Sequence, residues 1–227
     1  MPPPPPSSRS VSRTNRETRW RAVPLTGALL AVGLGAPLCA QLSVQLAGGV
    51  RATSTLVHDS IVTRVDVRPA LEPSLAVAAT VPLEARWSAE ALLDVSWGSL
   101  ERHDRGGPTV DLGRLGTVAL EVGVRRPLFA GLSARIAVGA LKYVPSGGTD
   151  LFRGSSGGVF PLGALALGYV PPLAFAQRWG LGVDVRYDVH AFITPALRAQ
   201  GFTTARPVHR IALALGARWP RAAARTP

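Results

Sequence analysis

The side chains best suited to chemistry are a serine, an aspartate and a histidine at alternating positions. Asp188 and His190 are two residues apart, so in an extended strand their side chains point the same way. Ser96 occupies a comparable position in another segment. A serine, a histidine and an acid that meet in space can hydrolyse an ester, with the histidine as general base. These residue types are common and no spacing supports the set, so we expect no catalytic residues.

The rest of the chain matches no catalytic or cofactor motif. It contains no P-loop, no dinucleotide-binding glycine pattern, and no pair of His or Cys residues at the spacing of metal ligands. The glycine-rich stretch 154–158 lies in a predicted loop and precedes no helix, which disfavours a phosphate cradle. We therefore expect neither a metal nor a cofactor.

Charged residues at alternating positions indicate a structural use instead. Because acids and arginines nearly balance on the shared face, and an unpaired buried charge would cost several kcal/mol, we expect a buried network of ion pairs. Asp184 and Arg186, with Glu121 and Arg125 as neighbours, are expected to stabilise the fold rather than carry an activity. The side chains assigned to this network are Glu90, Asp94, Glu121, Arg125, Arg135, Asp184, Arg186, Asp188, His190, Arg210 and Arg218.

Strict alternation of apolar and polar residues predicts the strands that must position these side chains. The clearest example is 181–191, where Leu181, Val183 and Val185 alternate with Gly182, Asp184 and Arg186. Eight segments show the pattern: 42–52, 71–81, 90–97, 117–125, 132–142, 163–170, 181–191 and 210–219.

The connections between these segments alternate in length. Short joints lie near 83–87, 127–131 and 171–179, and mostly longer ones near 53–69, 101–110, 145–158 and 193–207. This asymmetry is typical of a transmembrane β-barrel. Aromatic residues cluster at the end with short joints, as an interfacial girdle requires: Trp87, Phe129, Phe175, Trp179 and Trp219. We predict an all-β fold, an eight-stranded antiparallel up-and-down transmembrane β-barrel formed by residues 41–219.

Two other folds also fit part of the pattern. Residues 159–176 carry no charge, as in a transmembrane helix, but Pro161, Pro171 and Pro172 oppose a helix. A secreted soluble β-sandwich would alternate too, although its polar face should be richly charged. Here small residues outnumber charges on that face, which suits the narrow interior of an eight-stranded barrel.

The two ends of the chain lie outside the predicted barrel. Residues 1–40 contain a proline-rich start, five arginines and an uncharged run that ends in Ala40, which is the layout of a secretory signal peptide. Residues 220–227 form a basic tail.

Composition limits the classes that remain. The 227 residues are 47% hydrophobic and 17% charged, which excludes a disordered chain, and one cysteine excludes a disulfide scaffold. The net charge is +11, but the arginines alternate with acids instead of forming one basic stripe, so we expect no nucleic-acid partner.

With eight alternating strands, alternating joint lengths and the final strand 210–219, the chain resembles the small outer-membrane β-barrel proteins of diderm bacteria. Gly216 and Trp219 resemble the signal that the barrel-assembly machinery reads in that family, although family members commonly end at the aromatic residue. The resemblance implies a location in the outer membrane and contact with its lipid and lipopolysaccharide. It also implies two alternatives, an outer-membrane lipid hydrolase that uses His190 and a lumenal serine, or a narrow pore.

We expect a non-enzymatic outer-membrane protein that serves envelope structure or surface interaction through four long extracellular loops. A rigid scaffold commonly displays its functional residues on such loops. Loop arginines that could meet lipopolysaccharide phosphates are Arg64, Arg68, Arg102, Arg105, Arg153, Arg198 and Arg206.

Overall fold

The computed structural model describes residues 42–59, 65–84, 86–104, 107–146, 158–199, 201 and 203–219. The predicted signal segment 1–40 and the basic tail 220–227 lie outside the described residues. Within them the structure has ten strands, which are β1 (Ser43–Thr53), β2 (Val57–Asp59), β3 (Val65–Pro69), β4 (Glu72–Pro82), β5 (Ser88–Asp104), β6 (Thr109–Pro127), β7 (Leu132–Ser146), β8 (Val159–Tyr169), β9 (Leu181–Phe192) and β10 (Arg206–Trp219). Two short helices, α2 (Ala174–Trp179) and α3 (Pro195–Ala199), follow β8 and β9.

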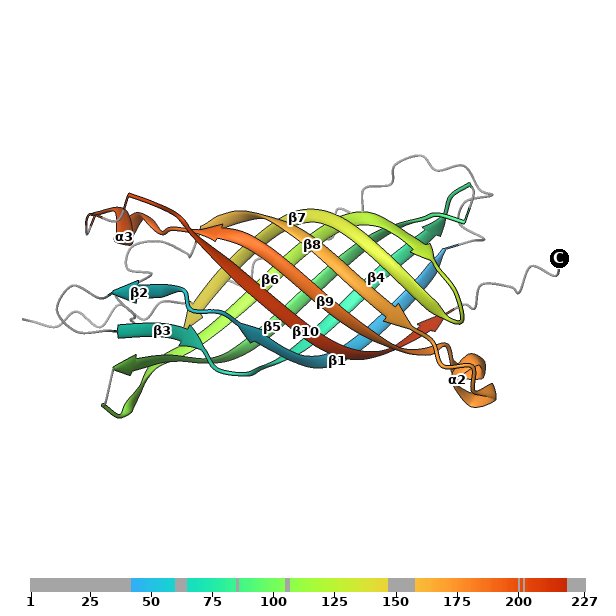
Figure 1. Cartoon of the computed structure of the whole chain (residues 1–227), viewed down its shortest axis with the longest axis horizontal. Coiled ribbons are helices and arrows are strands. Elements are labelled where there is room, and N and C mark those ends of the chain that lie inside the picture. The colour runs from blue at the N-terminus through green and yellow to red at the C-terminus, as the bar shows by residue number, and fades with distance from the viewer. Residues whose placement is uncertain are drawn as a thin grey trace, which may run out of the picture. The chain divides into compact units, whose positions relative to one another are not determined.

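Eight of the strands close into one antiparallel barrel (Figure 1). Each of β4 to β9 pairs with the strand that follows it in the chain, and β1 pairs with both β4 and β10. The closing register sets Val44 opposite Trp219, so both ends of the barrel chain lie at the same rim. These eight strands are the predicted ones, and their closure into a single ring confirms the barrel and excludes the two-sheet sandwich.

The outer face of the barrel is apolar around the whole ring. Because side chains alternate along a strand, each strand contributes one row outward and one row inward. The middle of every outward row carries an exposed aliphatic side chain, as shown by Leu46, Leu75, Leu93, Leu120, Ile136, Leu165, Val185 and Leu213. An apolar surface of this kind is stable when hydrocarbon surrounds it, and the closed ring leaves no unpaired strand edge there.

One rim, here named the turn end, carries the short connections 83–87, 128–131 and 170–180. The five predicted girdle aromatics lie there, and each is exposed. Helix α2 occupies the longest of these connections and ends at Gly180, whose φ of 60° and N–H bond to Ala176 form its C-cap. Neither described helix is long and apolar enough to cross a membrane.

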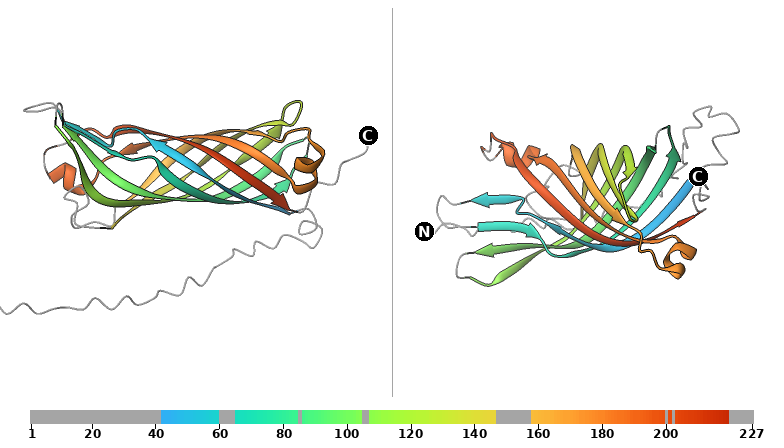
Figure 2. Two further views of the ribbon diagram at one scale, coloured as in Figure 1. Left: turned by 90° about the horizontal axis from the view of Figure 1, so that it is seen from below. Right: turned by 45° about the vertical axis from the view of Figure 1, so that its right-hand side comes forward.

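The opposite rim, named the loop end, differs from the expectation of four loops. Strands β5 and β6 run for 17 and 19 residues, beyond the 9–11 that cross a membrane, so much of segment 101–110 is paired strand. The first connection contains the hairpin β2–β3, and β3 pairs with the outer part of β5. These four segments form a sheet beyond the barrel, visible on the left of Figure 1 and on the left of the right-hand view of Figure 2. The predicted loop 145–158 falls mostly outside the described residues.

Candidate functional site

Asp94 is the centre of a charged layer inside the barrel. Its carboxylate accepts hydrogen bonds from Arg51 and from Arg186, the latter at 2.7 Å, and Arg210 lies 4.0 Å away. Asp188 lies 3.7 Å from Arg210 and 3.9 Å from Arg51. All five side chains are buried, so this layer fills the cross-section of the barrel with paired charge.

A second group of ion pairs lies nearer the turn end. Glu90 accepts from Arg125 at 2.7 Å and lies 2.8 Å from Nε of Arg135, which also donates to Glu121 at 2.6 Å. Asp184 accepts from Arg125 at 3.1 Å. The structure thus pairs Asp184 with Arg125, and Arg186 with Asp94. Residues two apart on one strand reach different partners because the contacts run across the barrel.

The structure buries ten of the eleven side chains assigned to the network and leaves Arg218 half-buried. It adds buried residues that the sequence interpretation missed, notably Arg51, Glu72 and Gln45. Arg51 and Glu72 lie directly opposite each other in the β1–β4 register. Both stand on the inward parity of segments 42–52 and 71–81, so extending the alternation along these weaker strands would have identified them.

An apolar cluster closes the interior at the loop end. The Tyr143 ring lies 5.8 Å from the ring of Phe160 and 5.3 Å from that of Phe192, measured between centroids. Leu115 and Leu141 are fully buried in the same cluster. The cluster also includes Leu56 from the first connection and Leu197 from α3, both at the loop end. The loop end of the barrel is therefore packed with side chains.

The serine, histidine and aspartate that could hydrolyse an ester are not brought together. Ser96 donates to Glu72 at 2.7 Å and shares a 2.7 Å hydrogen bond with Thr117. His190 contacts the Tyr143 hydroxyl through Nε2 at 2.9 Å, while Asp188 faces the arginines. Ser96 is also fully buried, so no substrate could reach it in this arrangement. Among the residues that the structure describes, no group of three or more potential metal ligands occurs.

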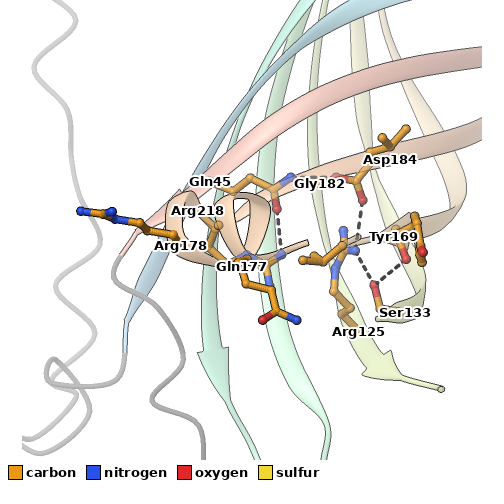
Figure 3. A pocket seen from close by; sticks show the side chains of 14 residues that line it. Gln45, Arg125, Ser133, Tyr169, Gln177, Arg178, Gly182, Asp184 and Arg218 are labelled. Atoms are coloured by element: carbon orange, nitrogen blue, oxygen red, sulfur yellow. Dashed lines mark hydrogen bonds and ion pairs between the residues drawn. The ribbon is translucent and has the colours of Figure 1, made fainter. Parts of the chain in front are cut away.

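An open pocket of about 830 Å³ lies at the turn end, next to α2 (Figure 3). The polar residues of its lining are Gln45, Arg125, Ser133, Asp184 and Arg218 from the barrel strands, and Gln177 and Arg178 from α2. Further in, between Glu90 and Arg186, a second cavity of about 10 Å³ has room for about one water. From the turn end inward, the interior therefore narrows from this open pocket to the closed Asp94 layer.

The sheet at the loop end carries short-range polar contacts. His58 Nδ1 lies 2.6 Å from Asp66, and His103 Nε2 lies 3.1 Å from Glu101. Asp104, at the tip of β5 and outside the membrane-spanning part, accepts two hydrogen bonds from Arg102, which lower the pKa of this carboxyl.

The loop arginines lie partly within the described residues. Arg68, Arg102, Arg198 and Arg206 are exposed at the loop end. The other three, Arg64, Arg105 and Arg153, lie outside the described residues.

A closed eight-stranded ring with an apolar outer face and a packed polar interior defines a small transmembrane β-barrel of the outer-membrane type. No protein-family model and no curated protein matches the sequence. The solved structures that resemble this one are outer-membrane proteins. Their sequence identities to this chain are low, so the similarity is one of fold alone.

Three of them illustrate the similarity. Ail of Yersinia pestis, solved in complex with the heparin analogue sucrose octasulfate, is 11% identical; the match covers 79% of this chain and 99% of Ail, with a TM-score of 0.47. AlkL is 14% identical over 82% of this chain and 94% of its own, with a TM-score of 0.46. OprG of Pseudomonas aeruginosa is 11% identical over 79% and 96%, with a TM-score of 0.40.

Proposed function

We propose that the chain is a non-enzymatic protein of a bacterial outer membrane that presents a polar β-sheet and loop arginines to the cell exterior. The observation that carries this proposal is the contrast between the two parts of β5 and β6. The parts nearer the turn end belong to a barrel that the Asp94 layer closes on the inside. The parts beyond the barrel, at the loop end, form the sheet with β2 and β3.

The orientation follows from the asymmetry of the rims. In outer-membrane barrels the short turns face the periplasm and the longer connections face outward. The turn end with its aromatic girdle is therefore assigned to the periplasmic side, and the loop end to the exterior. Residues 1–40 would direct export, and the last strand, which ends at Trp219, would be read by the barrel-assembly machinery during insertion.

Lipopolysaccharide is the partner that the charge at the loop end favours. Arg68, Arg198 and Arg206 are exposed there. Lys142 adds a cation on the outward row of β7 near the same rim. Guanidinium groups bind phosphate with two parallel hydrogen bonds, and lipopolysaccharide presents phosphates at this height of the membrane.

The test compares wild type with a variant in which Arg68, Arg198 and Arg206 are changed to Gln. We expect both proteins to insert, to show heat-modifiable migration on gels and to be recovered with the outer membrane. The variant should bind lipopolysaccharide vesicles more weakly, and the loss should shrink at high salt. Arg126→Gln, at the turn end, serves as the matched control.

The hydrolase alternative makes a different prediction. Purified protein in vesicles should release no fatty acid from phospholipid or lipopolysaccharide. Release that disappears in His190→Ala, with the barrel still folded, would replace this proposal with the enzyme.

A further inference from the structure

The turn-end pocket has the size and openness of a binding site, and the function proposed above does not use it. Its volume of about 830 Å³ lies within the range of small-ligand pockets. It opens at the rim opposite to the sheet, where α2 lies beside it in Figure 3. Its existence does not depend on what the loop end binds.

Three arginines line this pocket, and two of them, Arg125 and Arg218, belong to one series of hydrogen bonds. Arg218 donates to Gln45 Oε1 at 2.7 Å, and Gln45 Nε2 donates to Asp184 at 2.7 Å. Arg125 donates from Nη1 both to Asp184 and to Ser133 Oγ, the latter at 3.0 Å. Figure 3 shows these contacts along one wall.

The charges of the side chains joined by these hydrogen bonds do not cancel in pairs. Among the described residues, no carboxylate lies within ion-pair distance of Arg218, whose hydrogen-bond partner is a neutral amide. Arg125 is compensated by Glu90 and Asp184, while Arg135, which Glu90 also contacts, has a second acid partner in Glu121. On this wall Arg125 and Arg218 lie beside one carboxylate, that of Asp184. Within the described residues Arg218 makes a single side-chain hydrogen bond, so its guanidinium has further donors to offer another group.

Glycines keep this wall clear. A Cβ on Gly168 would lie 2.5 Å from Arg125 Nη1, 2.7 Å from Asp184 Oδ1 and 2.9 Å from Ser133 Oγ. A Cβ on Gly216 would lie 2.8 Å from Gln45 Nε2. The polar side chains can hold this arrangement at the pocket because both neighbouring positions lack a side chain.

We propose that the turn-end pocket binds a small oxyanion, a carboxylate or a phosphate, with Arg218 as its principal contact and Arg125 as the second cation. Guanidinium groups bind such anions with charge-assisted, often bidentate hydrogen bonds. Val170 and Val183 also line the pocket and offer an apolar surface to the carbon atoms attached to the anion. The oxyanion comes either from a soluble molecule or from the headgroup of a lipid in the adjoining leaflet.

The experiment uses the full chain, refolded in zwitterionic micelles with ¹⁵N-labelled arginine, and follows the side-chain Nε–Hε signals by NMR. Sodium phosphate is titrated at constant ionic strength against sodium chloride. We expect saturable shifts of the Arg218 and Arg125 signals. Arg126, which faces outward at the same rim with its guanidinium 5.3 Å from the Trp87 ring, should not shift.

Substitutions separate a built site from general anion attraction. Arg218→Gln should weaken phosphate binding at least about tenfold, since it removes a charge-assisted contact. Gly168→Ala should weaken it as well by displacing Arg125, whereas Arg126→Gln should leave it unchanged. Absence of saturable shifts in the wild type, or equal weakening by Arg126→Gln, would overturn the proposal.

A second titration identifies the source of the anion. Dihexanoyl phosphatidate, kept below its micellar concentration, replaces sodium phosphate. Tighter binding than that of phosphate, lost in Arg218→Gln, assigns the site to a lipid headgroup. Equal or weaker binding, also lost in that variant, assigns it to a soluble oxyanion.

Discussion

Asp94 has no exposed surface and contacts three arginines, so its charge is more important for the interior than that of any one arginine. Asp94→Ala would leave Arg51 and Arg186 without their principal acceptor. Breaking a buried pair in this way costs about 3–5 kcal/mol. We expect a loss of that size in the free energy of unfolding, measured by urea titration in phospholipid vesicles.

Arg186→Ala is the informative comparison. Asp94 keeps its hydrogen bond with Arg51 when Arg186 is removed, so the loss should be smaller, about 1.5–3 kcal/mol for a hydrogen bond to a charged group. If Arg186→Ala proved as harmful as Asp94→Ala, the central place of Asp94 in the layer would be refuted.

Asp104 tests electrostatics outside the membrane. Its pKa is lowered because Arg102 donates two hydrogen bonds to the carboxylate, so Arg102→Gln should raise the pKa of Asp104 toward its ordinary value. A carboxyl with a lowered folded-state pKa stabilises the fold above its unfolded-state pKa and loses this contribution as the pH falls through the folded-state pKa. Titration of the ¹³C signal of the carboxyl would measure the shift. An unchanged pKa in the variant would contradict the assigned cause.

Within the barrel strands, glycine marks places where neighbouring backbones approach closely. A Cβ on Gly139 would lie 2.2 Å from the carbonyl oxygen of Leu120 and 2.9 Å from the Cα of Glu121. Gly139→Val should therefore destabilise the barrel by about 1–3 kcal/mol as an overpacked site, although valine has the higher strand propensity. The matched control is Ala140→Val on the outward row of the same strand, which should be near neutral. Urea unfolding of both variants in vesicles decides between packing and propensity.

Strand identity could be predicted from the sequence where one face meets hydrocarbon, and less well beyond the membrane. Alternation identified the eight ring strands because lipid requires an apolar outward row. The outer ends of β5 and β6 carry Glu101, Arg102 and Asp111, residues typical of loops, so their pairing could not be read from polarity. The hairpin β2–β3 is too short for periodicity to detect, and its place depends on pairing with β5.

For the interior, the sequence predicted which side chains face inward but not which of them contact one another. Parity along each strand indicated which side chains face inward, since that depends only on local geometry. The partners could not be predicted, because Arg125 and Asp184 meet across the barrel and 59 residues apart in the chain. Tyr143 and Phe160 lie on the inward rows of β7 and β8, and they form part of the apolar closure at the loop end.

At the scale of the whole molecule, the apolar outer face makes stability depend on membrane depth. Leu120 is 57% exposed near the middle of the β6 outward row. Leu120→Arg should cost about 2–4 kcal/mol, and Val144→Arg near the loop end only about 0–1 kcal/mol. Urea unfolding in vesicles tests this difference. Equal costs at the two positions would contradict a membrane-spanning band.

The closed interior predicts that the barrel conducts no ions in its resting state. Two successive layers block it: the Asp94 layer, and the apolar cluster in which Leu115, Leu141 and Tyr143 have no exposed surface. Wild type inserted into planar bilayers should therefore give no steady unit conductance, with insertion verified by heat-modifiable migration of protein from the same vesicles. The double variant Phe160→Ala and Phe192→Ala should also remain closed, because it opens only the outer layer and leaves Asp94 with its arginines. Discrete current steps in the wild type would show that these side chains move aside. The protein would then be a narrow pore, as in the alternative considered above.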